Sequence, residues 1–418
     1  MIRKLSSNTI RQGNFIQKQV EEQQDRNEGN EPFTELVRDF LAPADFYTLL
    51  KKYGMDFYCG VPDSLLKDFC AYIANNSDSK KHVITSNEGT AVSLAAGYHM
   101  ATNKYGVVYL QNSGLGNIIN PIMSLATPSV YSIPMLILIG WRGEPGKRDE
   151  PQHNVQGAAT PGILASVGIP FQPLPDYLEG AEHVIETACH HMVTTKSPYC
   201  LLVKRQTFLP YQLKSKKKNE SAVLNREEVI KLIADRIGET DIVVGTTGML
   251  SRELYEYRDA KNEGHERDFY TVGSMGHASS IALGIAMQKP HRNVFCLDGD
   301  GAAIMHMGSL ATVGQSGCKN YKHIIFNNGG HDSVGGQPSD ASSDSFSFTH
   351  IAMGSGYREA WVSTTEEQII NSITRMMQLD GPVLCEIKCK MGSRKDLGRP
   401  TTTPLENKHD FMRFLKNY

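Results

Sequence analysis

The sequence has no run of about 18 apolar residues, no CxxC pair and no strong excess of charge of either sign. Without such a run, no membrane-spanning helix is expected. A formal net charge of -2 gives no reason to expect a nucleic acid or an anionic membrane surface as a partner. The eight cysteines are scattered, and several stand within apolar strands. We therefore expect reduced, buried thiols in an intracellular protein rather than disulfides or a zinc site.

The first 20 residues lack acidic side chains, although they carry Arg3, Lys4, Arg11 and Lys18. A basic, serine-containing segment of this kind is typical of a mitochondrial transit peptide, and a disordered tail is an equal alternative. We therefore treat residues 1–41 as an N-terminal extension. The expected location is cytoplasmic, or mitochondrial if this extension is a transit peptide.

Beyond the extension, short apolar strands alternate with glycine-rich turns and helical patterning. The expected strands lie within 56–61, 81–86, 106–113, 134–140 and 199–205, and then within 241–248, 269–274, 293–300, 323–328 and 382–388. Continuous apolar strands that are each followed by a helix predict parallel sheets with helices on both faces. We predict two α/β domains, at 42–208 and 222–418, joined by a lysine- and serine-rich linker at 209–221.

One strand, 293–299, ends in Gly-Asp-Gly and passes directly into a helix near Ala302. In parallel α/β sheets, ligands bind at the carboxyl ends of the strands, where Asp300 stands. Gly299 and Gly301 allow a ligand to approach the backbone closely. The free N–H groups at the start of the helix favour a phosphate. Taken alone, however, Gly-Asp-Gly is more often only a tight turn.

A second strand end stands at the same edge, because the next strand closes with Asn327 and Asn328. A carboxylate, a carboxamide and a loop carbonyl offer the oxygen ligands that Mg²⁺ prefers. Gly-Asp-Gly followed by 25 residues and Asn-Asn resembles the motif of thiamin-diphosphate (ThDP) enzymes. The resemblance implies that Asp300 and Asn328 bind Mg²⁺ through their side chains and Gly330 through its carbonyl. Asn328 is preferred over Asn327 because the family uses the second asparagine.

The family also needs a carboxylate on the cofactor's aminopyrimidine, which favours the tautomer that removes the reactive proton. Glu88 follows the strand at 81–86 and precedes a run of small residues. The resemblance implies that Glu88 is this catalytic residue. Without the metal motif, Glu88 would equally suit the first turn of a helix.

Two glycine-containing stretches resemble other parts of the family's cofactor site. "QNSGLGN" at 111–117 resembles the loop on the pyrimidine side and contains Asn112. "TVGSMGHASSIALGIAM" at 271–287 resembles the segment under the cofactor. There, Gly273 would accept the 4'-amino group and Met275 would be an apolar wedge, although a thioether also suits an ordinary core. The expected cofactor-binding residues are thus Asn112, Gly273, Met275, Gly301 and Ala302.

In this family, the two ends of one cofactor are held by different chains. The resemblance therefore implies a homodimer or larger homo-oligomer with shared active sites. Larger relatives carry a central third domain, for which the linker at 209–221 is too short.

Across 45–395 the amino-acid sequence resembles that of the phosphonopyruvate decarboxylase subfamily. Examples are the stretches "GVPDSLLKDF", "LILIGWRGEPGKRDEPQHNVQG" and "NNGGHDSVGGQP". This implies conversion of 3-phosphonopyruvate to phosphonoacetaldehyde and CO₂ in phosphonate biosynthesis. Sulfopyruvate decarboxylase is the nearest neighbour in chemistry. An acetolactate-synthase-like carboligase and a non-catalytic ThDP-binding partner are the further alternatives. The missing central domain counts against the carboligase. The presence of Glu88, Asp300 and Asn328 in one chain counts against the non-catalytic ThDP-binding partner.

A substrate with an anionic tail needs cations, and a loop after the strand at 134–140 supplies them. It carries Arg142, Lys147, Arg148 and His153. Arginine forks suit carboxylate and phosphonate oxygens, although solvation of the surface would explain any one of these residues. Arg142 and His153 are the expected substrate ligands.

Three more positions bear on the substrate. Ser64 falls where related decarboxylases place a polar substrate contact, while Asp63 beside it equally suits a helix N-cap. His331 follows the metal loop and is a candidate proton donor. For Lys204 and Arg205, at the end of another strand, a pocket and an interface are equal alternatives.

Overall fold

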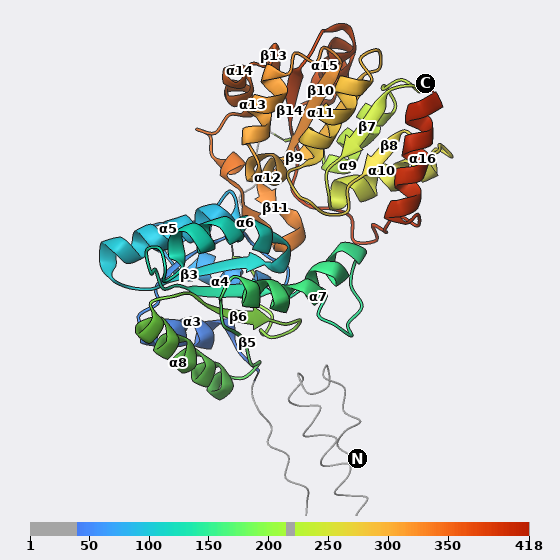
Figure 1. Cartoon of the computed structure of the whole chain (residues 1–418). Helices are drawn as coiled ribbons and strands as arrows, with labels where there is room; N and C mark the ends of the chain where they lie inside the picture. The colour runs from blue at the N-terminus through green and yellow to red at the C-terminus, as the bar shows by residue number, and fades with distance from the viewer. Residues whose placement is uncertain (1–39, 215–221, 418) are drawn as a thin grey trace, which may run out of the picture. The chain divides into compact units, whose positions relative to one another are not determined.

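The computed structural model describes residues 40–214 and 222–417, so the predicted extension and much of the predicted linker lie outside the described residues. These residues form two compact units (Figure 1). The first is built from residues up to 212, and the second from residue 213 onward together with 84–90 and 150–152. No helix within the described ranges has the length and apolar character that crossing a bilayer requires.

The first unit contains a six-stranded sheet with the strand order β2-β1-β3-β4-β6-β5. Its strands are β1 (Phe57–Gly60), β2 (His82–Ile84), β3 (Gly106–Gln111), β4 (Leu136–Gly140), β5 (Phe171–Pro173) and β6 (Tyr199–Val203). Strand β3 runs parallel to β1 and β4, and β6 runs parallel to β4 and β5. The helices are α3 (Pro43–Lys52), α4 (Lys67–Asn76), α5 (Glu88–Thr102), α6 (Leu115–Pro121), α7 (Pro151–Ser166) and α8 (Leu178–Thr195), with short turns η2 (Asn112–Gly114) and η3 (Ile122–Ala126).

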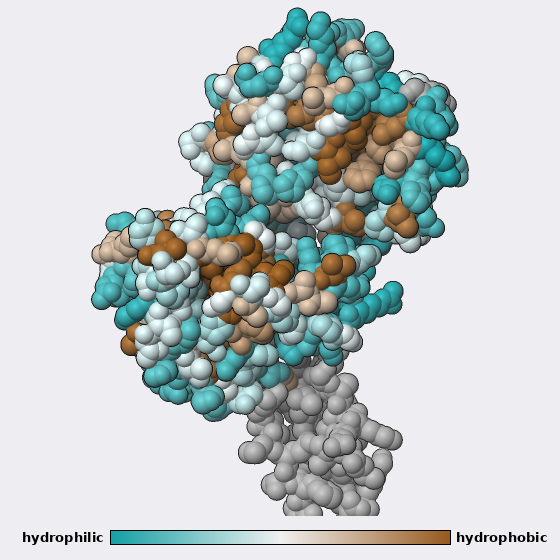
Figure 2. All heavy atoms as spheres, in the orientation of Figure 1, coloured by the Kyte–Doolittle hydropathy of each residue, from teal (hydrophilic) through white to brown (hydrophobic). Residues whose placement is uncertain are grey.

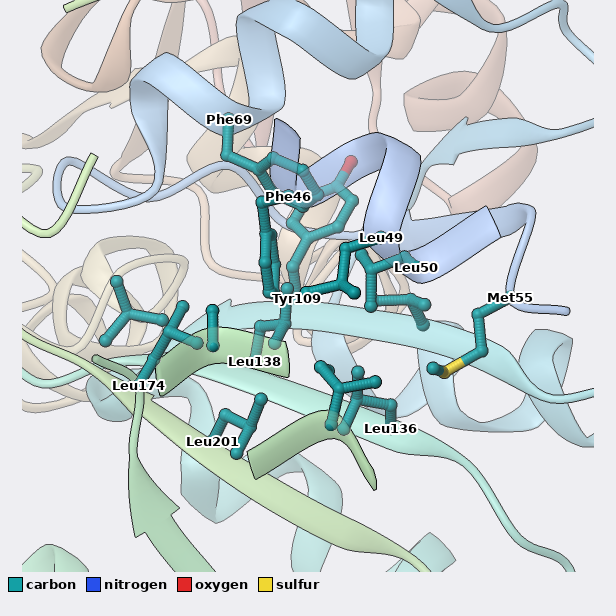
Figure 3. Close-up of a cluster of buried hydrophobic side chains, with 14 of the residues drawn as sticks. Phe46, Leu49, Leu50, Met55, Phe69, Tyr109, Leu136, Leu138, Leu174 and Leu201 are labelled. Carbon is teal, nitrogen blue, oxygen red and sulfur yellow. The ribbon is translucent and has the colours of Figure 1, made fainter. Parts of the chain in front are cut away.

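Alternate residues of each central strand enter opposite cores, because successive side chains of a strand point to opposite faces. Val107 and Tyr109 of β3 join the core under α3, α4 and α8, which Figure 3 shows in close-up. Val108 and Leu110 join the core under α5, α6 and α7. Figure 1 shows α5 and α6 on one side of this sheet and α3 and α8 on the other. Burial on both faces explains why these strands are apolar throughout.

The second unit contains a six-stranded sheet with the order β13-β14-β10-β9-β7-β8, in which every neighbouring pair is parallel. Its strands are β7 (Ile242–Gly245), β8 (Asp268–Tyr270), β9 (Val294–Gly299), β10 (Tyr321–Asn327), β13 (Glu359–Ser363) and β14 (Val383–Lys388). A small ribbon pairs β11 (Gly330–His331) with β12 (Gln337–Pro338), beside the turns η4 (Asp332–Val334) and η5 (Asp340–Ser342). The helices are α9 (Arg226–Ala234), α10 (Met249–Ala260), α11 (Ala278–Gln288), α12 (Asp300–Met305), α13 (Gly308–Gln315), α14 (Phe348–Ser355), α15 (Glu366–Gln378) and α16 (Pro404–Asn417).

The two sheets share one topology. When the six sheet strands are numbered within each unit, both orders read 2-1-3-4-6-5. In each sheet the chain leaves the first and third strands in opposite directions, so a topological switch point lies between them. Ligands of open α/β sheets bind at the carboxyl ends of such strands. In the second unit the third strand is β9, which leads directly into Asp300.

The observed architecture confirms the predicted fold class of two parallel sheets, each covered by helices on both faces, and the described residues contain no third unit between them. All eight cysteines are free; six are buried as expected, whereas Cys189 and Cys318 are half-buried. Two differences stand out. The helix predicted to start near Ala302 begins at Asp300, and the edge strands β5 and β13 were not predicted.

Candidate active site

Asp300 lies at the point where β9 ends and α12 begins, beside the neighbouring strand β10. Its side chain is buried, and one carboxylate oxygen accepts hydrogen bonds from Ser339 Oγ at 2.6 Å and from the Gly329 N–H at 3.1 Å. Burial raises the pKa of Asp300 to about 6, against the lowering effect of the Ser339 hydroxyl. A carboxylate held at this desolvated position suits a cation, which compensates its charge. Sequence analysis did not single out Ser339.

The two asparagines after β10 have different environments. Asn327 donates through Nδ2 to Glu386 Oε1 at 2.7 Å and to the Ala341 carbonyl at 3.3 Å, and its Oδ1 accepts from the Gly329 N–H at 3.0 Å. Its carboxamide therefore ties β10 to β14 and to the turn η5. Asn328 lies one residue further, in the loop whose Gly329 N–H reaches Asp300. The choice of Asn328 over Asn327 as the metal ligand stays a prediction.

The backbone from Asn328 to Gly330 is tightly constrained. Asn328 Oδ1 accepts from the Gly330 N–H at 3.1 Å. Gly329 has φ +74, a value that favours glycine. A Cβ at Gly330 would collide with Met391 Cε and lie 3.1 Å from the Gln337 carbonyl. The predicted donors are a carboxylate, a carboxamide oxygen and a backbone carbonyl, which are hard oxygen ligands of the kind that Mg²⁺ prefers. The residues present therefore fit the predicted ion.

Three other predicted residues lie together next to Asp300. A Cβ at Gly301 would stand 3.0 Å from His331 Cε1 and 3.5 Å from Met275 Cε, so only glycine leaves this corner open. Burial lowers the pKa of His331 to about 4, which keeps its imidazole neutral near pH 7. Ser274, which precedes Met275, has φ 52, and a left-handed non-glycine residue is a known mark of a constrained site.

Gly273 and Ala302 border the same region of the second unit. Gly273 stands in the loop that follows β8 and leads to α11. Ala302 lies in the first turn of α12 and is buried, and its carbonyl would stand 2.8 Å from a Cβ at Gly276. Gly276 has φ +86, so this backbone approach also requires glycine.

Glu88 is the first residue of α5 and is buried, with 4% of its surface exposed. The adjacent Asn87 accepts from the Thr90 N–H at 2.9 Å and so caps this helix itself. An acid that served only the helix dipole would remain in water, because burying a carboxylate is costly. Glu88 is therefore not a solvated acid of the first helical turn, and its catalytic role stays a prediction.

In the first unit, five residues form a group that we call the Asp149 cluster: Ser64, Arg142, Asp149, His153 and Arg205. Asp149 lies at its centre, and only 2% of its side chain is exposed. Arg142 donates to it from Nε at 2.9 Å and from Nη2 at 2.5 Å, while Arg142 Nη1 donates to Ser64 Oγ at 2.9 Å.

The remaining members approach Asp149 from other directions. His153 Nδ1 lies 3.1 Å from one oxygen, and Arg205 Nη2 lies 3.0 Å from the other. Lys204, by contrast, pairs with Glu144 at 2.7 Å. Lys204 and Arg205, which sequence analysis could not assign, therefore have different partners. Arg205 and Asp149 join the candidate substrate-binding residues predicted from the sequence. Lys147 and Arg148 are exposed.

Two predicted residues support this cluster locally. Asn112 donates to the Arg142 carbonyl at 2.8 Å and accepts from the Arg142 N–H at 3.2 Å, so its carboxamide holds the loop backbone. Its predicted contact with the cofactor stays a prediction. Asp63 is fully buried and accepts from the backbone N–H of Leu66 at 3.0 Å and from that of Leu65, so it holds the turn before α4 and is not the N-cap of that helix, which is Leu66.

Comparison with known proteins identifies the family. Residues 43–160 match the N-terminal TPP binding domain of thiamine pyrophosphate enzymes, and residues 244–387 match their C-terminal TPP binding domain. The chain is 31% identical to phosphonopyruvate decarboxylase of Streptomyces viridochromogenes over 390 residues, which cover 90% of this chain and 95% of that protein. This chain belongs to the thiamin-diphosphate-dependent decarboxylases.

Two further relatives narrow the type of decarboxylase. Phosphonopyruvate decarboxylase of Streptomyces hygroscopicus is 30% identical over 90% of this chain and 94% of its own length. Sulfopyruvate decarboxylase of Methanosarcina acetivorans is 28% identical over 69% of this chain and 76% of its own length. The ThDP-dependent decarboxylase described here is therefore of the phosphonopyruvate or sulfopyruvate type, and its cofactor is thiamin diphosphate.

Proposed function

We propose that this decarboxylase converts 3-phosphonopyruvate to phosphonoacetaldehyde and CO₂ with ThDP and Mg²⁺, as a step of phosphonate biosynthesis. The observation that carries the choice of substrate is the Asp149 cluster. Its two guanidinium groups carry two positive charges and Asp149 carries one negative charge, so the five residues have a formal net charge of at least +1. The similarity to two phosphonopyruvate decarboxylases over 90% of the chain supports the same choice.

The charge of the substrate's tail distinguishes the alternatives. A phosphonate resembles a phosphate monoester, whose second ionisation falls near about pH 6, and therefore carries close to two negative charges near neutrality. A sulfonate carries one negative charge, and pyruvate has no anionic tail. Guanidinium groups suit the oxygens of a tetrahedral anion, and the cluster brings two of them to one place. The cluster therefore favours the more highly charged phosphonate.

Bound thiamin diphosphate supplies the electron sink for loss of CO₂. In our proposal, Glu88 holds the proton at the aminopyrimidine N1'. Asp300, Asn328 and Gly330 hold Mg²⁺, and Met275 gives the site an apolar wall. We propose His331 as a relay that passes a proton from water to the carbon that loses CO₂, because a neutral imidazole can accept a proton at one ring nitrogen while it donates from the other.

We also propose a homodimer or larger homo-oligomer in which different chains complete each active site. Figure 2 shows apolar side chains gathered over α5 and α6 of the first unit. The exposed apolar residues of α5 and of η3, which follows α6, include Met100 and Met123. Light scattering on the purified protein should give at least twice the monomer mass, and a fully active monomer would contradict this part of the proposal.

Neighbouring cations allow a matched test of the proposed substrate. Arg205 bonds to Asp149, whereas Lys204 bonds to Glu144. We expect Arg205→Gln to lower kcat/KM for phosphonopyruvate by roughly 10-fold. This is the low end of the about 1.5–3 kcal/mol that a charge-assisted contact contributes, because half of the Arg205 side chain is exposed. The matched control Lys204→Gln should stay near the wild-type value. An equal loss in both variants, or no loss in either, would contradict a role for the Asp149 cluster in substrate binding.

The carboligase alternative predicts a different product. Incubation with pyruvate should then yield an acetohydroxy acid, whereas the proposed reaction yields only an aldehyde. Condensed product as the main product with pyruvate, together with no aldehyde from phosphonopyruvate, would overturn the proposal in favour of the carboligase.

A further inference from the structure

Asp332 stands in η4, directly after the ribbon strand β11, and faces the predicted metal ligand Asn328. Its Oδ2 accepts from Asn328 Nδ2 at 2.8 Å and from Arg226 Nη1 at 3.1 Å. The Gly392 N–H donates to both of its oxygens, at 3.1 and 3.0 Å. Only 12% of the Asp332 side chain is exposed, so these contacts fix its position.

The contact with Asp332 decides which way the Asn328 carboxamide points. A carboxamide has an oxygen that can bind Mg²⁺ and a nitrogen that cannot. An ionised carboxylate only accepts hydrogen bonds, so it must face Asn328 Nδ2. Asn328 Oδ1 then points away from Asp332, to the side on which it accepts from the Gly330 N–H. Asn328 Oδ1 therefore lies on the side of Gly330, whose carbonyl is the other predicted ligand in this loop.

Arg226 and Glu253 hold Asp332 in turn. Arg226 lies on α9 and forms a two-bond pair with Glu253 of α10, at 2.7 and 2.9 Å. The exposed fractions of these two side chains are 8% and 1%. One guanidinium between two carboxylates leaves a net negative charge in this triad, next to Asn328. A negative charge at this distance favours a cation at the predicted site.

We propose that Asp332 is a positioning residue that sets the orientation of the Asn328 carboxamide and thereby the affinity for the divalent cation. This inference rests on the proposed Mg²⁺ site. Loss of an outer partner of a metal ligand typically costs about 10- to 100-fold in metal affinity. We expect that range for Asp332→Asn, because an amide at position 332 can face either edge of Asn328.

The test measures metal binding directly. Mn²⁺, used as a paramagnetic probe for Mg²⁺, is titrated into the full-length protein with saturating ThDP and followed by electron paramagnetic resonance. Asp332→Asn should raise the Kd for Mn²⁺ by roughly 10- to 100-fold. The control Asp344→Asn removes an exposed acid of the loop between β12 and α14 and should leave the Kd unchanged. A wild-type Kd in a folded Asp332→Asn protein would overturn the inference.

A double-mutant cycle separates positioning from a general structural effect. If Asp332 acts through Asn328, then adding Asp332→Asn to Asn328→Ala should change the Kd no further. Fully additive losses would overturn the inference. A wild-type protein that holds no Mn²⁺ even with ThDP would contradict the proposed metal site itself, whereas unchanged binding in Asp332→Asn contradicts only the role of Asp332.

Discussion

The carboxylate of Asp149 receives two bonds from the guanidinium of Arg142, at 2.9 and 2.5 Å, while the third nitrogen of Arg142 reaches Ser64. Asp149 therefore fixes both the plane and the direction of the Arg142 fork. Gly143, the next residue, has φ +68, and a Cβ there would collide with the His153 carbonyl. The loop thus depends on glycine at this position to bring Arg142 and His153 to the same carboxylate.

We predict that Arg142→Lys lowers kcat/KM for phosphonopyruvate by about 10- to 100-fold and leaves the rate with pyruvate within about threefold. Lysine keeps the charge but cannot reproduce the two-bond fork. Steady-state kinetics with both substrates measure the effect. Arg148→Lys, which changes an exposed arginine of the same loop, is the matched control. Equal losses with both substrates would mean that Arg142 does not bind the anionic tail.

For Glu88→Gln, we expect kcat to fall by about 100- to 10,000-fold, which is the usual range for loss of a general acid–base group. Glutamine keeps the shape of the side chain, so ThDP binding measured by calorimetry should change by only a few-fold. Full turnover in this variant would exclude the role given to Glu88.

The buried Asp63 predicts a pH dependence of stability. Burial raises the pKa of Asp63 to about 6, above its ordinary value of 3.8, against the lowering effect of the Leu65 and Leu66 N–H groups. For an acid whose folded-state pKa is raised, the folded state binds more protons than the unfolded state between these two values, so this group adds stability as the pH falls from about 7 to about 4.

Asp63→Asn removes that dependence. Between about pH 7.5 and pH 5, wild type should gain roughly 1 kcal/mol of unfolding free energy relative to Asp63→Asn. Urea unfolding of both proteins at the two pH values gives this difference, in which the other titrating groups cancel. A gap that is constant with pH, or that changes in favour of the variant at low pH, would show that Asp63 ionises normally in the folded protein.

Substitution of Asn327 and substitution of Asn328 should have different effects. Asn327→Ala removes buried bonds to Glu386 and Ala341, and we expect it to cost roughly 2–4 kcal/mol of stability. Asn328→Ala should instead raise the Kd for Mn²⁺ by at least about 10-fold, to a value that can still be measured, with a smaller change in melting temperature. Thermal unfolding without metal and a metal titration on both variants make the comparison. Loss of metal binding in Asn327→Ala alone would reverse the assignment.

Much of the fold followed from local patterns in the sequence. Strands β3, β4 and β9 are buried on both faces, so their sequences are mostly apolar and they were predicted; β10 was predicted from its apolar centre at 324–326, although it also buries Lys322 and His323. The edge strands β5 and β13 were missed because most of their residues are half-buried or exposed, which removes that signal. The start of α12 was placed two residues late because glycine on both sides of Asp300 reads as a turn.

Some residues of the candidate site were likewise predicted from the sequence, and others were found only in the structure. Asp300 and Asn328 directly follow strands, and Glu88 begins the helix that comes after β2, so a local motif reveals all three. Asp149 and Arg205 follow β4 and β6, which are neighbours in the sheet but distant in the sequence. Their meeting depends on strand order, which no local pattern encodes. Asp332 similarly gains its role from Arg226 on α9, far from it along the chain.

The most direct test of the central claim is the release of aldehyde by the purified full-length protein with ThDP and Mg²⁺, measured in parallel with phosphonopyruvate, sulfopyruvate and pyruvate. We predict a kcat/KM for phosphonopyruvate that exceeds the other two by at least about 10-fold, equivalent to about 1.4 kcal/mol of transition-state binding. Equal rates, or a preference for sulfopyruvate, would contradict the assignment of the Asp149 cluster to a phosphonate.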